Sequence, residues 1–178
     1  MTQGPSSMAS VDVEQLARTY GALVLSTAHR ILGDISAAQD VQQDVFVRLL
    51  ERPPPQVESW PAWLKTATTR KAIDRLRRNQ RRDRLQSFIP QPFRSARPEE
   101  VRTGNELVVG LRKASTALSR REAQVFFLSA FSELSSQEVA QQLAISENNV
   151  HVVLHRARQR LQSLLETSGN LETTEESS

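Results

Sequence analysis

Apolar side chains recur every three or four residues along most of the chain, which is the spacing of an α-helix with one buried face. In the N-terminal half this pattern predicts three helices, at 13–32, at 36–51 and from about 59 to beyond 82. Gly33–Asp34 separates the first two helices, and Pro53–Pro55 ends the second. Ser36, with Gln39 three residues later, has the form of a capping box that would open the second helix.

The C-terminal half repeats a helix-start signal, in which a serine or threonine is followed three residues later by glutamate. The signal occurs at 103–106, 119–122 and 135–138, and each copy predicts the start of a helix. Between the two halves, residues 87–102 contain three prolines and show no helical period. We interpret this segment as a linker.

The pattern therefore predicts an all-α protein of two small helical bundles, at 11–86 and 103–166, joined by a flexible linker at 87–102. Residues 1–10 are small and polar, and residues 167–178 are acidic and rich in serine and threonine. We expect both terminal segments to be disordered, because they contain too few apolar side chains to form a core.

Composition narrows the choice of function. The chain has no cysteine, which excludes disulfides and thiolate chemistry, and it has only three histidines. It has no apolar run long enough to span a bilayer and no signal-peptide pattern at its start, so we expect no membrane insertion. Only three of its 23 basic residues are lysines. Arginine suits bidentate contacts with phosphate groups and guanine edges, so the distribution of the arginines matters.

Residues 135–146 have the spacing of a helix-turn-helix. A short helix at 135–143 precedes a tight turn at Ala144–Ile145, and Ser146 would cap a longer helix. The inner stripe of that helix would be Val150, Leu154, Ala157 and Leu161, and its outer face Asn148, Asn149, Val152, Arg156 and Gln159. The outer side chains are of the types that read base edges in a major groove. The alternative is an ordinary αα-hairpin, and we favour DNA binding.

The third helix is strongly basic. Arg70, Asp74, Arg77 and Arg81 fall on one stripe, with Arg78 and Arg82 beside them, and Trp60 and Trp63 stand at the start of the helix. Arginines beside aromatic rings suit melted or single-stranded nucleic acid. The alternative is a solvated arginine face with tryptophans in the core. We favour the core for Trp63 and nucleic acid for the arginines.

The second helix has a polar stripe made of Asp40, Gln43, Asp44 and Val47. A carboxylate pair can bind a metal or transfer protons, but no histidine or third acid is spaced to complete such a site. The remaining interpretations are a solvated face and a protein-docking face. His151 and His155 could chelate a metal but lack a third ligand nearby, so we interpret them as incidental or DNA-facing.

Taken together, these residues resemble the extracytoplasmic-function family of RNA polymerase sigma factors. The segments 33–46 and 63–78 resemble region two of that family, and 117–125, 138–140 and 154–158 resemble region four. Both domains, their order and the linker match over about residues 11–165.

The resemblance implies a set of site residues. The surface that docks on polymerase core would be Asp40, Gln43, Asp44 and Val47. The DNA-binding residues of region two would be Arg70, Asp74, Arg77, Arg78 and Arg81. Those of the helix-turn-helix would be Glu147, Asn148, Asn149, His151, Val152, His155, Arg156 and Gln159.

The resemblance also implies an alternative sigma factor of the bacterial cytoplasm. Such a protein binds the β′ clamp helices and the β subunit of core polymerase, recognises promoter DNA, and takes part in DNA melting and transcription initiation. An anti-sigma factor is a further partner that the resemblance allows. It implies no catalytic residue, cofactor or metal, and hence no enzyme.

The sequence departs from the family pattern at several positions. Arg70 replaces an asparagine, Ala144 replaces the turn glycine, and His151, Val152 and Val153 replace Lys, Ser and Arg, so the recognition helix is less basic at its start. Two other functions compete with the sigma factor. One is a stand-alone helix-turn-helix repressor or activator, for which no dimer interface or effector pocket is evident. The other is a small nuclease using Asp40 and Asp44, for which no nucleophile, phosphate loop or ligand set is evident.

Overall fold

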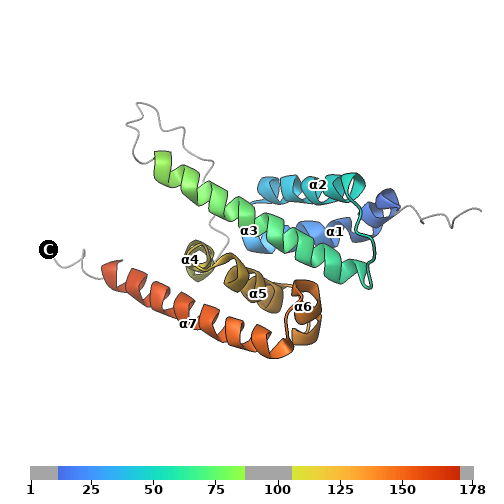
Figure 1. Cartoon of the computed structure of the whole chain (residues 1–178). Helices are drawn as coiled ribbons and strands as arrows, with labels where there is room; N and C mark the ends of the chain where they lie inside the picture. Colours follow the sequence, from blue (N-terminus) through green and yellow to red (C-terminus); the bar gives the residue numbers. More distant parts are fainter. Residues whose placement is uncertain (1–11, 87–105, 173–178) are drawn as a thin grey trace, which may run out of the picture.

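The computed structural model describes residues 12–86 and 106–172, and every regular element in these ranges is an α-helix (Figure 1). The N-terminal bundle consists of α1 (Val13–Leu32), α2 (Ile35–Glu51) and α3 (Trp60–Gln86). The C-terminal bundle consists of α4 (Glu106–Ser115), α5 (Arg120–Phe131), α6 (Ser136–Leu143) and α7 (Glu147–Glu172). The predicted all-α fold class is confirmed. None of the helices in these ranges is long and apolar enough to cross a membrane.

Several predicted boundaries change. Helix α7 runs to Glu172, so it continues past the last inner-stripe leucine and into the segment from residue 167 for which the sequence predicted disorder. The predicted disordered segment at 1–10, the linker at 87–102, the helix start at Thr103 and the last six residues lie outside the described residues.

The connection between α1 and α2 is made by two adjacent residues. Gly33 ends α1 in the left-handed conformation, with φ of 76°, which glycine adopts without strain. The Asp34 carboxylate then accepts hydrogen bonds from the backbone N–H groups of Ser36 and Ala37, at 2.8 and 3.3 Å. Asp34 is therefore the N-cap of α2, and the capping box predicted at Ser36 is wrong. The carboxylate of Asp34, which precedes Ser36 by two residues, already accepts from the free N–H groups at the start of α2, and Ser36 lies inside the helix.

The core of the N-terminal bundle is made of small and branched apolar side chains from all three helices, namely Val24, Ala28, Ala38, Val41, Val45 and Leu64. Trp63 packs against this cluster, as the sequence predicted. Trp60 stacks edge-on against Trp63, with ring centroids 5.9 Å apart. The start of α3 is thus anchored to α1 and α2, and the basic part of α3 extends beyond this anchor.

Capping boxes open both α5 and α6, as the sequence predicted. At each start a serine hydroxyl accepts from the backbone N–H of a glutamate three residues on, and that glutamate accepts from the serine N–H. The Glu122 carboxylate lies 2.7 Å from the Ser119 nitrogen. Hydrogen bonds from Ser119 and the nearby Arg160 and Arg156 lower the pKa of Glu122, because they favour its charged form.

This lowered pKa makes the contribution of Glu122 depend on pH. We expect Glu122→Gln to reduce the free energy of unfolding at neutral pH by about 0.3–1.5 kcal/mol, the usual worth of a helix cap. The difference between wild type and variant should disappear as the pH falls through the lowered pKa of Glu122, because protonated Glu122 then resembles glutamine. Urea denaturation of both proteins at pH 7 and at low pH measures it. A difference that persists at low pH would contradict a role for the charged cap.

Helices α6 and α7 pack at an angle over α5, around a core that contains Val125, Leu128, Val139, Leu143 and Val150. The turn between α6 and α7 passes through Ala144, whose φ of 52° is in the left-handed region. The helix-turn-helix predicted from spacing is therefore present, and its turn holds an alanine in a conformation that favours glycine.

Ala144→Gly should stabilise the protein by about 0.5–1 kcal/mol, because removing the Cβ relieves backbone strain by more than the added flexibility of the unfolded chain costs. The melting temperature should rise by about 1–4 °C. Ala130→Gly is the matched control, since Ala130 is exposed within α5 and its φ is negative. That variant should lower the melting temperature. Destabilisation by both substitutions would contradict the strain at Ala144.

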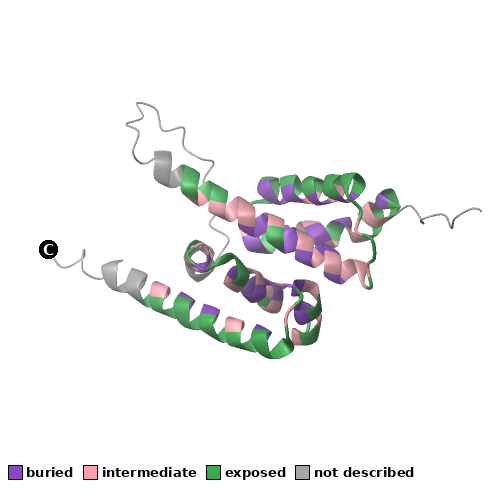
Figure 2. Cartoon of the chain, in the orientation of Figure 1, coloured by how far each residue is buried: buried purple, intermediate pink, exposed green. Residues whose placement is uncertain are grey.

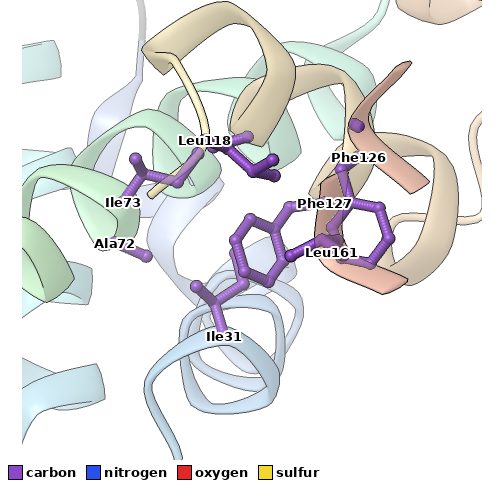
Figure 3. Packing of buried hydrophobic residues seen from close by; sticks show 9 residues of the cluster. Ile31, Ala72, Ile73, Leu118, Phe126, Phe127 and Leu161 are labelled. Atoms are coloured by element: carbon purple, nitrogen blue, oxygen red, sulfur yellow. The ribbon is translucent and has the colours of Figure 1, made fainter. Parts of the chain in front are cut away.

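The two bundles share a third core. Phe127 of α5 packs with Ile31 of α1 and Ile73 of α3, and Leu118 and Phe126 complete the contact (Figure 3). Helices α1 and α3 both pack against the C-terminal bundle, and α3 also packs against α1 and α2, so the buried residues gather where these helices face one another (Figure 2). The sequence left open whether the bundles pack together, and the structure is compact.

Candidate polymerase and nucleic-acid interfaces

The four residues predicted to dock on polymerase lie on the outer face of α2. Asp40, Gln43, Asp44 and Val47 are all exposed, and we call them the acidic stripe. Val47 is 50% exposed, and the neighbouring Leu50 is 66% exposed. Large apolar side chains beside carboxylates on an open helix face are typical of a protein-docking surface.

Each carboxylate of the acidic stripe meets a cation from α3. The Asp40 carboxylate lies 2.7 Å from the Arg75 guanidinium, and the Asp44 carboxylate lies 3.3 Å from the Lys71 amine. The charge pattern of the sequence had not predicted these pairs. The sequence feature that could have predicted them is a matched spacing, since the acids are four residues apart on α2 and the bases four apart on α3.

These ion pairs leave the carboxylates accessible. The side chains of Asp40 and Asp44 remain 55% and 59% exposed. Exposed pairs of this kind contribute only about 0–1 kcal/mol to stability, so the fold does not depend on them. The two carboxylates face separate cations, and the described residues contain no group of three or more metal-ligating side chains.

Some of the residues predicted to bind DNA on α3 are exposed, and others contact the C-terminal bundle. Arg78 and Arg81 are exposed, whereas Arg77 is partly buried and donates to the Leu118 carbonyl at 2.6 Å. Asp74 forms an ion pair of 2.9 Å with Arg120. Arg70 stays exposed and donates to the Gln142 carbonyl at 3.3 Å, and partial desolvation, followed by the charges of Arg121 and Arg48, lowers its pKa.

The C-terminal bundle therefore covers part of the predicted DNA-binding face of α3. Further arginines hold this arrangement by donating to helix-end carbonyls of the other bundle. Arg112 of α4 donates to the carbonyls of Ile31 and Arg30, both at 3.1 Å. Arg30 of α1 donates to the Phe131 carbonyl at 3.0 Å. Cations are favoured at helix C-termini, where the last carbonyls have no intrahelical partner. We call this compact form the closed arrangement.

The outer face of α7 is open in the closed arrangement. All eight residues predicted there are exposed: Glu147, Asn148, Asn149, His151, Val152, His155, Arg156 and Gln159. Val150, Ala157 and Leu161 are buried on the opposite side, as the sequence predicted. The Ser146 hydroxyl accepts from the Asn149 N–H at 3.2 Å and caps the helix. We call these eight residues the recognition face.

Comparisons with known proteins agree with this geometry. The profile described as Sigma-70 region 2 matches residues 16–82, and that described as Sigma-70, region 4 matches residues 110–161. Together the two profiles match most of the chain, and they occur in the order that the two bundles have. The chain belongs to the sigma-70 family.

Curated relatives place the chain among the extracytoplasmic-function (ECF) sigma factors of this family. It is 27% identical over 151 residues to the probable ECF RNA polymerase sigma factor SigI of Mycobacterium tuberculosis, covering 81% of this chain and 52% of that protein. It is 26% identical over 158 residues to the ECF RNA polymerase sigma factor SigE of Mycolicibacterium smegmatis, covering 85% and 61%. The chain thus spans about half the length of the curated relatives it matches.

Two solved structures have the same fold. The sigma factor RpoE of Bartonella quintana, in complex with the anti-sigma factor NepR, aligns with a TM-score of 0.55 at 20% identity, covering 87% of this chain and 97% of that one. CnrH, in complex with the cytosolic domain of CnrY, aligns with a TM-score of 0.53 at 23% identity, covering 87% and 88%.

Proposed function

We propose that this protein is an alternative sigma factor of the bacterial cytoplasm. It binds RNA polymerase core, directs the enzyme to promoters and takes part in melting the DNA, without catalysing a reaction itself. The observation that carries this proposal is the presence, on one chain and in family order, of an exposed acidic stripe on region 2 and an exposed recognition face on region 4.

The acidic stripe is the surface we assign to core binding. Its carboxylates suit basic residues of the β′ clamp helices, and Val47 supplies apolar contact area at the same face. Region 4 would then meet the β subunit. The pairs formed with Lys71 and Arg75 must yield to polymerase side chains on docking, which costs little because they are exposed.

Promoter binding is assigned to two elements. The arginines of α3, with Arg70 and Asp74, would hold the melted upstream element through its phosphates, and the recognition face of α7 would read the distal element. The closed arrangement engages Asp74 and Arg77, so the bundles must separate before these two residues can meet DNA. An anti-sigma factor is a further proposed partner, because both solved relatives are complexes, one with an anti-sigma factor and one with a cytosolic domain.

A binding assay with polymerase core separates this function from that of a stand-alone repressor. The full chain should co-elute with sigma-free core on gel filtration, and it should protect promoter DNA from nuclease only when core is present. A chain that fails to bind core and instead protects duplex DNA alone is a repressor or activator, and the proposal is then wrong.

Within the recognition face, Arg156 is expected to read a base edge. Arg156→Ala should cost about 1–3 kcal/mol at the preferred distal element and relax the preference at one position. Arg158→Ala is the matched control, because Arg158 lies beside Leu111 and Phe126 and not on the recognition face. Comparison over a promoter library measures both. Should Arg156→Ala weaken all promoters equally, Arg156 contacts phosphate and the assignment fails.

A further inference from the structure

We propose that the cleft between α3 and the start of α5 binds a small anion that carries a chain of phosphate groups, such as a nucleoside polyphosphate. The binding itself does not depend on the sigma-factor function, whereas its consequence for promoter binding rests on it.

The cleft lies where the two bundles meet. It has a volume of about 440 Å³. One wall is formed by Arg77, Arg78 and Arg81 of α3, and the other by Arg120 and Thr116 at the α4–α5 connection. Gln80 adds an amide group. The two walls come from different bundles, so the cleft in this form exists only in the closed arrangement.

Positive charge dominates the cleft. Four guanidinium groups face a single carboxylate, that of Asp74, which is paired with Arg120. The Arg120 side chain is still 66% exposed, and Arg78 and Arg81 are exposed as well. The Nε of Arg77 is buried and has no acceptor among the described residues. An atom without solvent-accessible surface is out of reach of an ion in the cleft, so Arg77 contributes there only through the part of its side chain that lines the cleft.

The arrangement of these groups selects the ligand class. Four guanidinium groups on two walls present more bidentate donor forks than the oxygens of one phosphate can engage at once. A linear chain of phosphates can contact all four guanidinium groups, because each of them binds phosphate oxygens in a bidentate manner. The Thr116 hydroxyl and the Gln80 amide are further donors suited to phosphate or ribose oxygens.

Such a ligand would favour the closed arrangement. By bridging Arg120 of one bundle to the α3 arginines of the other, it binds the closed form and not the open one, and a ligand shifts an equilibrium by its difference in affinity for the two states. Because Arg77, Arg78 and Arg81 are also the proposed contacts to promoter DNA, a bound polyphosphate would oppose promoter binding.

Calorimetric titration of the free, full chain with inorganic tripolyphosphate, at about 0.1 M monovalent salt, tests the site without polymerase or DNA. We expect saturable binding of one ion per chain. Arg120→Gln and Arg81→Gln, one from each wall, should each weaken it about tenfold or more. Arg18→Gln is the matched control, since Arg18 is an exposed arginine paired with Glu14 on α1. Circular dichroism establishes that each variant is folded.

Two results would overturn the proposal, and a further titration identifies the ligand. Binding that is unsaturable, or that Arg120→Gln and Arg18→Gln weaken equally, would show nonspecific attraction and overturn the proposal. Equal weakening of tripolyphosphate and of a single-stranded DNA oligonucleotide by Arg120→Gln would make the cleft a DNA site and also overturn it. Titration with a nucleoside triphosphate separates the two sources of the ligand. Tighter binding than tripolyphosphate supports a nucleotide, and equal binding supports the phosphate chain alone.

Discussion

Replacing Asp40 and Asp44 together by lysine should weaken binding to polymerase core by about a hundredfold or more. Disrupting one buried charge pair at an interface costs about 2–5 kcal/mol, and about 1.4 kcal/mol corresponds to a factor of ten. The helical content should not change, because both side chains are exposed and their pairs with α3 contribute little to stability. Fluorescence titration of labelled core with each protein measures the effect.

The ion pairs with α3 supply a sharp control. Lysines at positions 40 and 44 would face Arg75 and Lys71 and could disturb the contact between α2 and α3. Adding Lys71→Glu and Arg75→Glu restores both pairs with reversed sign and leaves the reversed charge on the outer face of α2. If the docking assignment is right, this quadruple variant is as stable as wild type yet still fails to bind core. Recovery of core binding would show that the acids act only within the fold.

Changing Arg77 and Arg78 together to alanine should depress transcription at every promoter, whatever its sequence. The two guanidinium groups are assigned to phosphates and the melted strand, which carry no base preference. Loss of two phosphate contacts should also flatten the dependence of open-complex formation on salt by up to about two units of slope. Rates of open-complex formation over a series of salt concentrations measure this.

Arg77 has a second contact that this variant removes, its hydrogen bond to the Leu118 carbonyl in the closed arrangement. Arg120→Gln separates the two roles, because it removes the ion pair between Asp74 and the C-terminal bundle and leaves every cation of α3 in place. We expect Arg120→Gln to keep or raise transcription. If the Arg77/Arg78 variant also raises it, these arginines serve mainly to hold the bundles together, and their assignment to DNA is wrong.

The local structure of this protein could be predicted from its sequence because the signals are local. Helix α1 has the predicted bounds because Gly33 ends it, and α5 and α6 begin where their serine and glutamate pairs stand. The start of α2 was misassigned because Asp34 and Ser36 are both good caps, and spacing alone does not tell which carboxylate or hydroxyl reaches the free N–H groups.

The closed arrangement could not be predicted, because it depends on contacts between distant segments. Phe127, Ile31 and Ile73 each fit the periodicity of an ordinary helix core, and nothing in their spacing shows that they meet one another. The same holds for the arginines of α3, since a pattern of charges does not show that Arg77 reaches the Leu118 carbonyl. Helix α3 contributes Leu64 to the N-terminal core and Ala72 and Ile73 to the shared core, and the apolar pattern of α3 alone does not show that these residues face different partners.

Run-off transcription tests whether this chain acts as a sigma factor. Sigma-free core polymerase is combined with the full chain, with the Asp40/Asp44 lysine variant, or with no addition, over a library of genomic promoter fragments. We expect discrete transcripts only with the wild-type chain, from fragments that share two upstream sequence elements. Transcripts that are no more abundant than with core alone, while the wild-type chain is folded and in excess, would contradict the proposed function.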